Sequence, residues 1–256
     1  MHKTFEDVLK LDGQAFIEAL LKFEQDRFDR DFLKGSVYEQ INAEFGIFPA
    51  KKVYPVYFAG DIFNPKDKLV FIGMNPAYNE KTSKHEQRYA ETVGLVNICR
   101  NMFAYFKSQR SGLIHYYANI GGFLKRLYGI EKIDWDWYQD NFVNLDMIPY
   151  HSANTGGLRI NNPAQFRKIH FTILLKLLGH LQPTKPIFIL GFPSFESYLS
   201  QSHFENIITF KKYNNFWAGK IDGKYDFIGL PFLTRIKGGK DALVENIKKI
   251  EHINTN

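Results

Sequence analysis

The segment KLVFIGMNPAYNE, Lys68 to Glu80, is a short apolar run that stops at Gly73-Met74-Asn75-Pro76. A continuous apolar run that ends at glycine and proline is typical of a buried parallel strand. Pro76 cannot continue a central ladder, because proline has no backbone N–H to donate. The segment therefore predicts a buried strand with the polar side chain of Asn75 at its carboxyl end.

Further strands and helices alternate along the chain. Apolar runs predict strands within residues 141–149 and 185–193, and Asp222-Gly223 predicts a hairpin whose second arm, DFIGLP, is the last core strand. Helical spacing predicts helices over residues 6–45, 85–107, 117–128 and 162–181, at ESYLSQ, and at the final segment GGKDALVENIKKIEHI. The alternation predicts an α/β fold of three layers, α/β/α, around a central, mainly parallel four-stranded sheet.

The length of 256 residues suits one domain, with residues 1–50 as an N-terminal helical extension. Cys99 is the only cysteine, which excludes a disulfide framework. The N-terminus, MHKTFEDVLK, has early acids and no apolar run, and no stretch is long and apolar enough to span a membrane. We expect a monomeric protein without membrane contact, in the cytoplasm or associated with the nucleoid.

The formal net charge is +6, and the basic residues are unevenly distributed. No acidic residue occurs from Thr92 to Ile130 or from Met147 to Phe195, although both windows contain Lys and Arg. Such windows predict a positive surface for a polyanion. The alternative is that these charges are spread around helices and average out in space.

Polar side chains at strand ends are the candidates for a binding site, because ligands of α/β folds bind beyond the carboxyl ends of the strands. Asn75 could hold a water or the edge of a base, or it could simply form an Asn-Pro turn. Asn144 lies inside the apolar run FVNLDMI, where an unpaired amide costs roughly 1 to 3 kcal/mol. Its partner is either the backbone or a ligand such as a pyrimidine. Asp61 and Asp146 are either catalytic carboxylates or caps and ion-pair partners.

These motifs resemble those of the uracil-DNA glycosylase superfamily. VFIGMNPAY is similar to its first motif, Gly-x-Asn/Asp-Pro at a strand end, which is Gly-Met-Asn-Pro in the single-strand-selective branch. WDWYQDNFVNLDMIPYHS resembles a segment in which a Trp, here Trp135 or Trp137, precedes a strand with a base-reading Asn, here Asn144. ANIGGFLKRLYG and KPIFILGFPS resemble a helix between the motifs and the third strand, so the resemblance covers roughly residues 55–250.

The resemblance implies a uracil-DNA-glycosylase-like fold and an enzyme of base excision repair. It would hydrolyse the N-glycosidic bond of uracil or a related damaged base in single- or double-stranded DNA. Water is the nucleophile, so no metal or organic cofactor is expected. Asn75 would position that water, and Asn144 would bind the pyrimidine edge. Tyr116, with His115 and Tyr117 as neighbours, would stack on the flipped base. The pocket would be completed by Gly73, Pro76 and Tyr78.

The last motif departs from the family. Its His-Pro-Ser is replaced by Leu230-Pro231-Phe232, and leucine cannot donate the hydrogen bond that stabilises charge on the leaving base. His151 and Arg235 are possible substitutes. The next residues are expected to bind DNA phosphate, partly through backbone amides; they are Arg235, Lys237, Gly238, Gly239 and Lys240. Two alternatives remain, a non-catalytic nucleic-acid-binding module on the same fold and a nucleotide-processing hydrolase unrelated to DNA.

Overall fold

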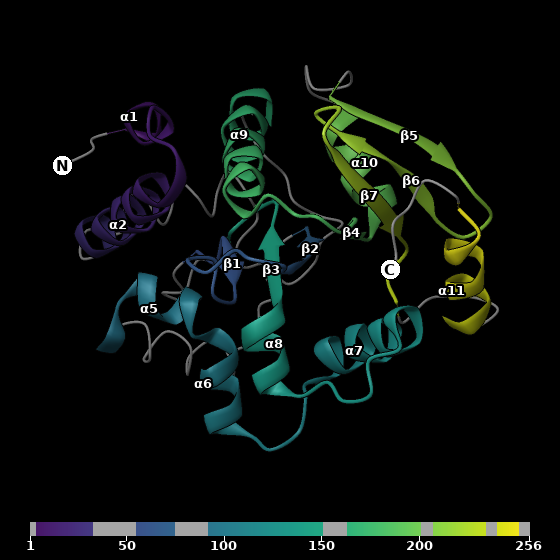
Figure 1. The fold of residues 1–256 in the computed structure, drawn as a ribbon. Helices are drawn as coiled ribbons and strands as arrows, with labels where there is room; N and C mark the ends of the chain where they lie inside the picture. Colours follow the sequence, from purple (N-terminus) through teal and green to yellow (C-terminus); the bar gives the residue numbers. More distant parts are fainter. Residues whose placement is uncertain are drawn as a thin grey trace.

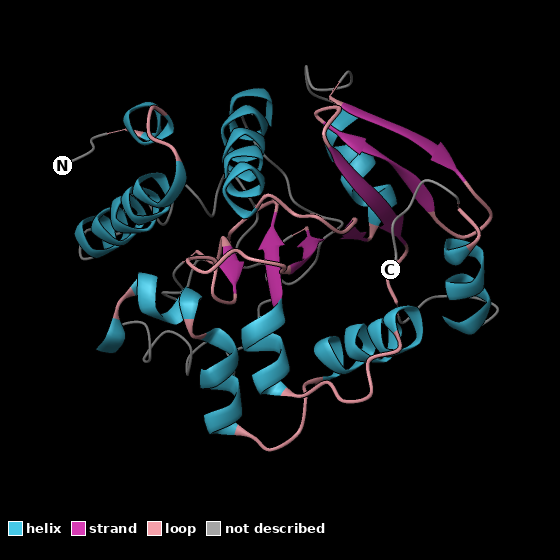
Figure 2. Cartoon of the chain, in the orientation of Figure 1, coloured by secondary structure: helices cyan, strands magenta, loops and turns pink. Residues whose placement is uncertain are grey.

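A mixed seven-stranded sheet with the strand order β1-β3-β2-β4-β7-β6-β5 forms the centre of the chain (Figure 1). The structure is a computed structural model, and it describes residues 4–32, 55–74, 92–150, 163–200, 207–233 and 240–250. Helices and strands alternate over most of these residues (Figure 2). The predicted α/β class is therefore confirmed.

Four neighbouring strands of the sheet pair in parallel, in the order β3-β2-β4-β7. They are β2 (Leu69–Gly73), β3 (Phe142–Asp146), β4 (Ile187–Leu190) and β7 (Tyr225–Leu230). The first three were predicted from apolar runs, and β7 was predicted as the second arm of the Asp222-Gly223 hairpin. Their carboxyl ends lie at one edge of the sheet, where Gly73 is opposite Asp146 and Leu190 is opposite Leu230. We call this edge the carboxyl edge.

The prediction of a four-stranded sheet is incomplete, because three further strands extend it through antiparallel pairing. The additional strands are β1 (Phe58–Ala59), β5 (Ile208–Lys212) and β6 (Trp217–Ile221). The first pairs with β3, whereas β6 joins β7 to β5. The β6–β7 turn at Asp222-Gly223 is the predicted hairpin, and both residues have the positive φ that such a turn requires. The strand β5 was missed because four of its five residues are exposed, so no apolar pattern marks it.

The helices follow the predicted spacing, with shifted ends. They are α1 (Phe5–Leu9), α2 (Gly13–Phe32), α5 (Leu95–Arg100), α6 (Met102–Gln109), α7 (His115–Tyr128), α8 (Trp135–Asn141), α9 (Pro163–Leu181), α10 (Phe192–Ser200) and α11 (Lys240–Lys248). Sequence reasoning missed α8, whose N-cap Asp134 accepts a hydrogen bond from the backbone of Trp137. The parts of the predicted helices at 33–45 and 85–91, and Asn162, lie outside the described residues.

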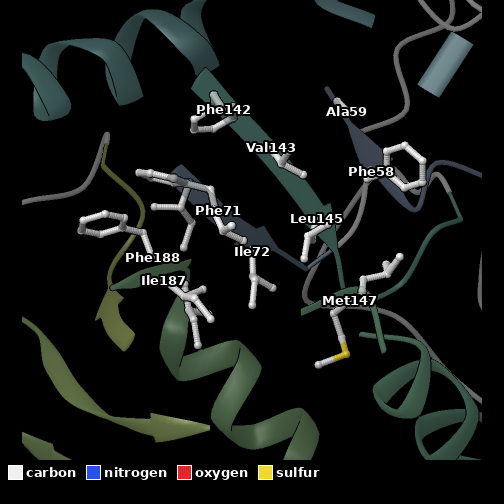
Figure 3. Packing of buried hydrophobic residues seen from close by; sticks show 14 of the residues in the cluster. Phe58, Ala59, Phe71, Ile72, Phe142, Val143, Leu145, Met147, Ile187 and Phe188 are labelled. Carbon is white, nitrogen blue, oxygen red and sulfur yellow. The ribbon is translucent and has the colours of Figure 1, made fainter. Parts of the chain in front are cut away.

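Side chains alternate between the two faces of the parallel strands, so both faces are apolar (Figure 3). On one face, Phe71 stacks on Phe188, and Phe123 of α7 packs edge-on against Phe188. On the other face, Phe192 of α10 stacks on Phe227. Helices therefore pack against both faces of the sheet.

The relative position of β2 and β3 is fixed at both ends. The buried amine of Lys68, just before β2, donates to the backbone carbonyls of Gln139 and Asp140 at the end of α8. Burial lowers the pKa of this amine, and nearby Asp61 and Asp140 partly offset the effect. Beyond the strands, the N–H of Met147 donates to the carbonyl of Gly73 at 2.9 Å.

The N-terminal helices pack against the rest of the chain through polar contacts as well as apolar ones. Glu24 of α2 is fully buried and accepts hydrogen bonds from the hydroxyls of Tyr57 at 2.7 Å and Tyr150 at 3.1 Å. Lys176 of α9 forms an ion pair with Asp12, just before α2. No helix among the described residues is long and apolar enough to cross a membrane.

We expect Gly229→Ala to destabilise the fold, because β7 and α10 leave no room for a methyl group. A Cβ at this position would lie 2.5 Å from the Cγ of Phe192. Overpacking of this kind should lower the free energy of unfolding by about 1 to 3 kcal/mol in a urea titration. Gly112→Ala is the matched control, because a Cβ there meets no atom within 4 Å. Equal stability of both variants would contradict the packing of α10 on β7.

Candidate functional site

Three polar side chains converge where β2 and β3 end. The hydroxyl of Tyr116 donates to Oδ1 of Asn144 at 3.0 Å, and Nδ2 of Asn144 donates to Oδ2 of Asp146 at 3.4 Å. We call Tyr116, Asn144 and Asp146 the strand-end cluster. Tyr116 and Asn144, which we expected to share one site, are therefore in direct contact, and their roles toward a base stay a prediction.

The local fold explains why these residues meet. Asn144 and Asp146 are two residues apart on β3, so their side chains lie on the same face of the sheet. Phe142, on that face too, packs against Tyr117 and Tyr138. The first turn of α7 lies against the same face and brings Tyr116 over the strand end. An apolar layer thus supports a polar cluster at the carboxyl edge.

Tyr116 combines an exposed ring with an inward-pointing hydroxyl. The residue is 40% exposed, a high value for an aromatic side chain, yet its hydroxyl is bonded to Asn144, which is only 4% exposed. Burial of the hydroxyl raises the pKa of Tyr116, and the charge of Asp146 raises it further. The hydroxyl therefore stays protonated and keeps the ring tied to Asn144.

Asp146 is the titratable group of the cluster. Burial raises the pKa of its carboxyl group to about 8, and the hydrogen bond from Asn144 opposes that shift. Below that pH the carboxyl group is predominantly protonated and can itself donate a hydrogen bond. Asp146 was one of two carboxylates for which the sequence left two roles possible, catalysis or structural pairing. The other, Asp61, forms an ion pair with Arg100.

Gly73 allows the carboxyl group of Asp146 to approach the backbone of β2. A Cβ at Gly73 would lie 2.8 Å from Oδ1 of Asp146 and 3.8 Å from the hydroxyl of Tyr116. A larger residue would therefore push Asp146 away from its present position. In this structure, Asp146 is the group that approaches Gly73, whereas the predicted place of Gly73 in a base pocket stays a prediction.

The other predicted pocket residues have different outcomes. Tyr117 is buried in the aromatic core, so its ring is not available to stack on a base. His115 is exposed and bonded to Asn119. Trp135 is also a core residue. The remaining predicted residues lie outside the described part of the chain; they are Asn75, Pro76, Tyr78, His151, Arg235, Lys237, Gly238 and Gly239.

Two expectations concern the segment after β7. Leu230 is fully buried at the end of β7, and the ring of Phe232 packs on Gly191, where a Cβ would meet it at 2.7 Å. Both residues are thus packing elements, which agrees with the absence of a donor at Leu230. Lys240 begins α11 and donates to Oδ1 of Asn119 on α7 at 2.7 Å. Burial lowers the pKa of Lys240, and Arg126 lowers it further.

The acid-free windows were predicted to form a positive surface, and among the described residues part of their positive charge is paired with acids. Several of their basic residues pair with acids from elsewhere in the chain, as the alternative proposed. These ion pairs are Arg100–Asp61, Lys107–Asp136, Arg126–Asp241 and Lys176–Asp12. The fold brings acids that are distant in the sequence next to the basic helices, so a linear window is a poor guide to surface charge.

A cleft of about 710 Å³ lies at the opposite edge of the sheet, away from the strand-end cluster. Its lining includes Leu69 at the start of β2, Asn141 just before β3, and Lys185 just before β4. We base the functional site on the strand-end cluster, because ligands of parallel α/β sheets bind at the carboxyl edge.

Among the described residues, no group of three or more His, Cys, Asp or Glu side chains is placed to hold a metal ion.

Sequence reasoning missed that Asp146 belongs with Asn144. The signal was present, because two polar residues at i and i+2 of an otherwise apolar strand share a face. Sequence reasoning also missed Asn119, which bonds to both His115 and Lys240. Contacts between the helices α7 and α11 leave no local pattern in the sequence.

Comparison with known proteins assigns no family to the chain. No protein-family model matches the sequence, and no curated protein matches it at a significant level of similarity.

We expect the contribution of Asp146 to the stability of the protein to fall as the pH rises from about 4 to about 8. The carboxyl group of Asp146 holds a proton in the folded state over this range, whereas an unfolded aspartate, with a pKa of about 3.9, does not. The folded state therefore binds more protons, and the contribution of Asp146 to the free energy of unfolding decreases with a slope of at most about 1.4 kcal/mol per pH unit.

Urea titrations at several pH values, followed by circular dichroism, would measure this dependence. Asp146→Asn should remove it and should be more stable than the parent above pH 8, whereas Glu131→Gln, a change to an exposed carboxylate, should retain it. A parent and an Asp146→Asn variant with parallel pH profiles would show that Asp146 titrates normally.

Proposed function

We propose that the protein is a DNA glycosylase that hydrolyses the N-glycosidic bond of uracil or a related damaged base. The observation that supports this most directly is the amide of Asn144. It is buried at the carboxyl edge of the sheet, it is held in one orientation by Tyr116 and Asp146, and it lies beside an exposed aromatic ring.

The amide of Asn144 has hydrogen-bonding capacity that its neighbours do not use. An amide oxygen accepts two hydrogen bonds and an amide nitrogen donates two. Within the described residues, Oδ1 receives one bond and Nδ2 donates one. One acceptor and one donor are left side by side. The N3–H and O4 of uracil form the complementary pair, a donor beside an acceptor.

The ring of Tyr116 suits the second requirement of base recognition. A flipped base loses its stacking in the duplex at a cost of a few kcal/mol, and stacking on an aromatic side chain returns about 1 to 3 kcal/mol. Tyr116 offers an exposed ring whose hydroxyl is anchored to the base-reading amide. The two contacts with the base would therefore be held at a fixed spacing.

The hydrolytic step is assigned by the resemblance to the uracil-DNA glycosylase superfamily. By that resemblance, Asn75, which follows β2 by two residues, positions the attacking water. Asp146 is largely protonated at neutral pH, and a protonated carboxyl group is a poor general base. Positioning alone can lower a barrier by several kcal/mol. The parallel pairing of β3, β2, β4 and β7 supports the glycosylase-like fold on which this assignment rests.

A non-catalytic nucleic-acid-binding module is the second candidate. It is favoured by Leu230, which is fully buried and cannot stabilise charge on a leaving base. Loss of one preorganised donor can cost a hundredfold or more in rate. Under this alternative, the strand-end cluster would still bind an unpaired base, but the glycosidic bond would stay intact.

We expect Asn144→Asp to change base preference without unfolding the protein. An ionised aspartate keeps acceptors at this position but loses both amide donors, so it can no longer donate to O4 of uracil. Single-turnover cleavage of oligonucleotides with uracil, hypoxanthine or other lesions, detected by alkaline strand scission, measures the effect. The expected loss for uracil is on the order of a hundredfold.

Asn141→Asp is the matched control, because Asn141 is exposed at the end of α8 and bonds only to the carbonyl of Trp137 among the described groups. It should leave the rates unchanged. Asn75→Ala separates the two candidates, since it should retain DNA binding and lose cleavage if the protein is an enzyme. A parent that binds uracil-containing DNA through Asn144 but cleaves no lesion would favour the binding module.

A further inference from the structure

The hairpin of β5 and β6 extends the sheet on the side away from β3, and it ends at the carboxyl edge. Because β6 is antiparallel to both β7 and β5, β5 runs in the same direction as the parallel strands. Lys212, Trp217 and Gly229 are successive Cα partners across the hairpin and β7. Figure 1 shows β5 as the outer strand of this part of the sheet.

The same row of partners continues to the strand-end cluster. Gly229 is opposite Ile189, Ile189 is opposite Ile72, and Ile72 is opposite Leu145, the neighbour of Asp146. The tip of the hairpin and the strand-end cluster therefore lie at one edge of one sheet. Five strand spacings of about 4.8 Å separate β3, which carries Asn144 and Asp146, from β5, which corresponds to roughly 24 Å.

The tip of the hairpin is basic and aromatic. No acidic residue occurs from Ile207 to Ile221. Lys211 and Lys212 are exposed and form no ion pair with any described residue, although Glu196 lies on the adjacent α10. Their amines lie over the rings of Tyr213 and Trp217, at 5.5 and 5.8 Å from the ring centroids.

The turn that carries these lysines is closed by specific contacts. The N–H of Tyr213 donates to the carbonyl of Phe216 at 2.8 Å, and the two rings are stacked with centroids 4.9 Å apart. Asn214 and Asn215 between them are exposed. Phe210, 40% exposed, packs edge-on against Phe192 of α10, which ties the strand to the core.

We propose that the tip of the β5–β6 hairpin, Lys211 to Trp217, is a second DNA-binding surface that contacts the backbone flanking the nucleotide at the strand-end cluster. This inference rests on the proposed function for its ligand. Along DNA, successive phosphates of one strand advance by about 3.4 Å, so roughly 24 Å corresponds to about seven nucleotides. The hairpin therefore holds the phosphates about seven positions from the recognised base.

Lysines on an edge strand have another common role, which is to prevent the strand from pairing with a second chain. That role requires charge anywhere along β5, whereas both unpaired lysines are at the end of β5 that lies at the carboxyl edge. The lysines toward the opposite edge, Lys220 in β6 and Lys224 in the β6–β7 turn, form ion pairs with Asp226 and Asp222. The position of the unpaired charges favours a polyanion at the carboxyl edge.

The test compares two double variants that lose the same charge. Lys211→Ala with Lys212→Ala removes the unpaired lysines, and Lys220→Ala with Lys224→Ala removes the paired ones. Fluorescence anisotropy with an undamaged duplex of about 24 base pairs gives the affinity as a function of salt. The first double variant should bind on the order of tenfold more weakly at low salt, and its slope of log K against log salt should shrink by about 1.8. The second should match the parent.

Length dependence gives an independent readout. A uracil-containing DNA with only about three nucleotides on each side cannot reach the hairpin, so on this DNA the parent and the first double variant should bind equally. Equal affinity of these two proteins for the long duplex would overturn the inference. So would a first variant that aggregates or changes its sedimentation behaviour with no effect on DNA binding, because that result assigns β5 to protection against a second copy.

The outcome separates this inference from the proposed function. Undamaged DNA contains no lesion, so the binding comparison does not depend on base excision. If the first double variant binds and cleaves uracil-containing DNA as the parent does, only the hairpin surface is wrong. If the parent binds no DNA even at low salt, both the hairpin surface and the glycosylase are wrong.

Discussion

The parallel pairing of β2 with β3 is the constraint on which the candidate site depends. It places Gly73 opposite Asp146, and the absence of a side chain at Gly73 lets the carboxyl group of Asp146 approach the backbone of β2. Asp146 in turn receives a hydrogen bond from Asn144, and Asn144 accepts the hydroxyl of Tyr116. A shift of β3 by one residue would turn Asn144 and Asp146 to the other face and break the cluster.

The sequence predicted secondary structure well where the side chains of a whole segment are buried. The strands β2, β3 and β4 were predicted because each is an apolar run that ends at turn residues. The strand β7 was predicted with its hairpin, because Asp-Gly accepts positive φ at little cost. The strand β5 was not predicted, because an exposed edge strand has no apolar face. The helix α8 was taken as the approach to a strand, because seven residues are too few for a clear period.

The candidate site was predictable in part for the same reason. Asn144 stands out because an amide in an apolar strand needs a partner, but the identity of that partner depends on long-range packing. Tyr116 and Asp146 could be named as candidates, yet only the fold shows that both bond to Asn144. Surface charge was the least predictable property. Lys107 pairs with Asp136 from a separate helix, whereas Lys211 and Lys212, outside both acid-free windows, have no acidic partner among the described residues.

Two contacts at one edge of the sheet give the proposed DNA complex its geometry. The strand-end cluster would hold one base through Asn144 and Tyr116, and the hairpin would hold the backbone at a distance set by the strand spacing. Neither contact needs a moving part among the described residues, because both are built on paired strands. Rigid positioning of this kind lowers the entropic cost of ordering the DNA on binding.

The central claim, that the amide of Asn144 binds the base, is tested most directly by nuclear magnetic resonance. The side-chain N–H₂ signals of Asn144 can be assigned by their absence in Asn144→Asp, and then followed while the protein is titrated with DNA. Two single-stranded oligonucleotides are compared that differ only in having uracil or cytosine at the central position. The account predicts that uracil shifts these signals, and that cytosine, which presents an acceptor at N3 and a donor at N4, leaves them near their free positions. Signals that stay unchanged with uracil, while other signals of the protein report DNA binding, would contradict it.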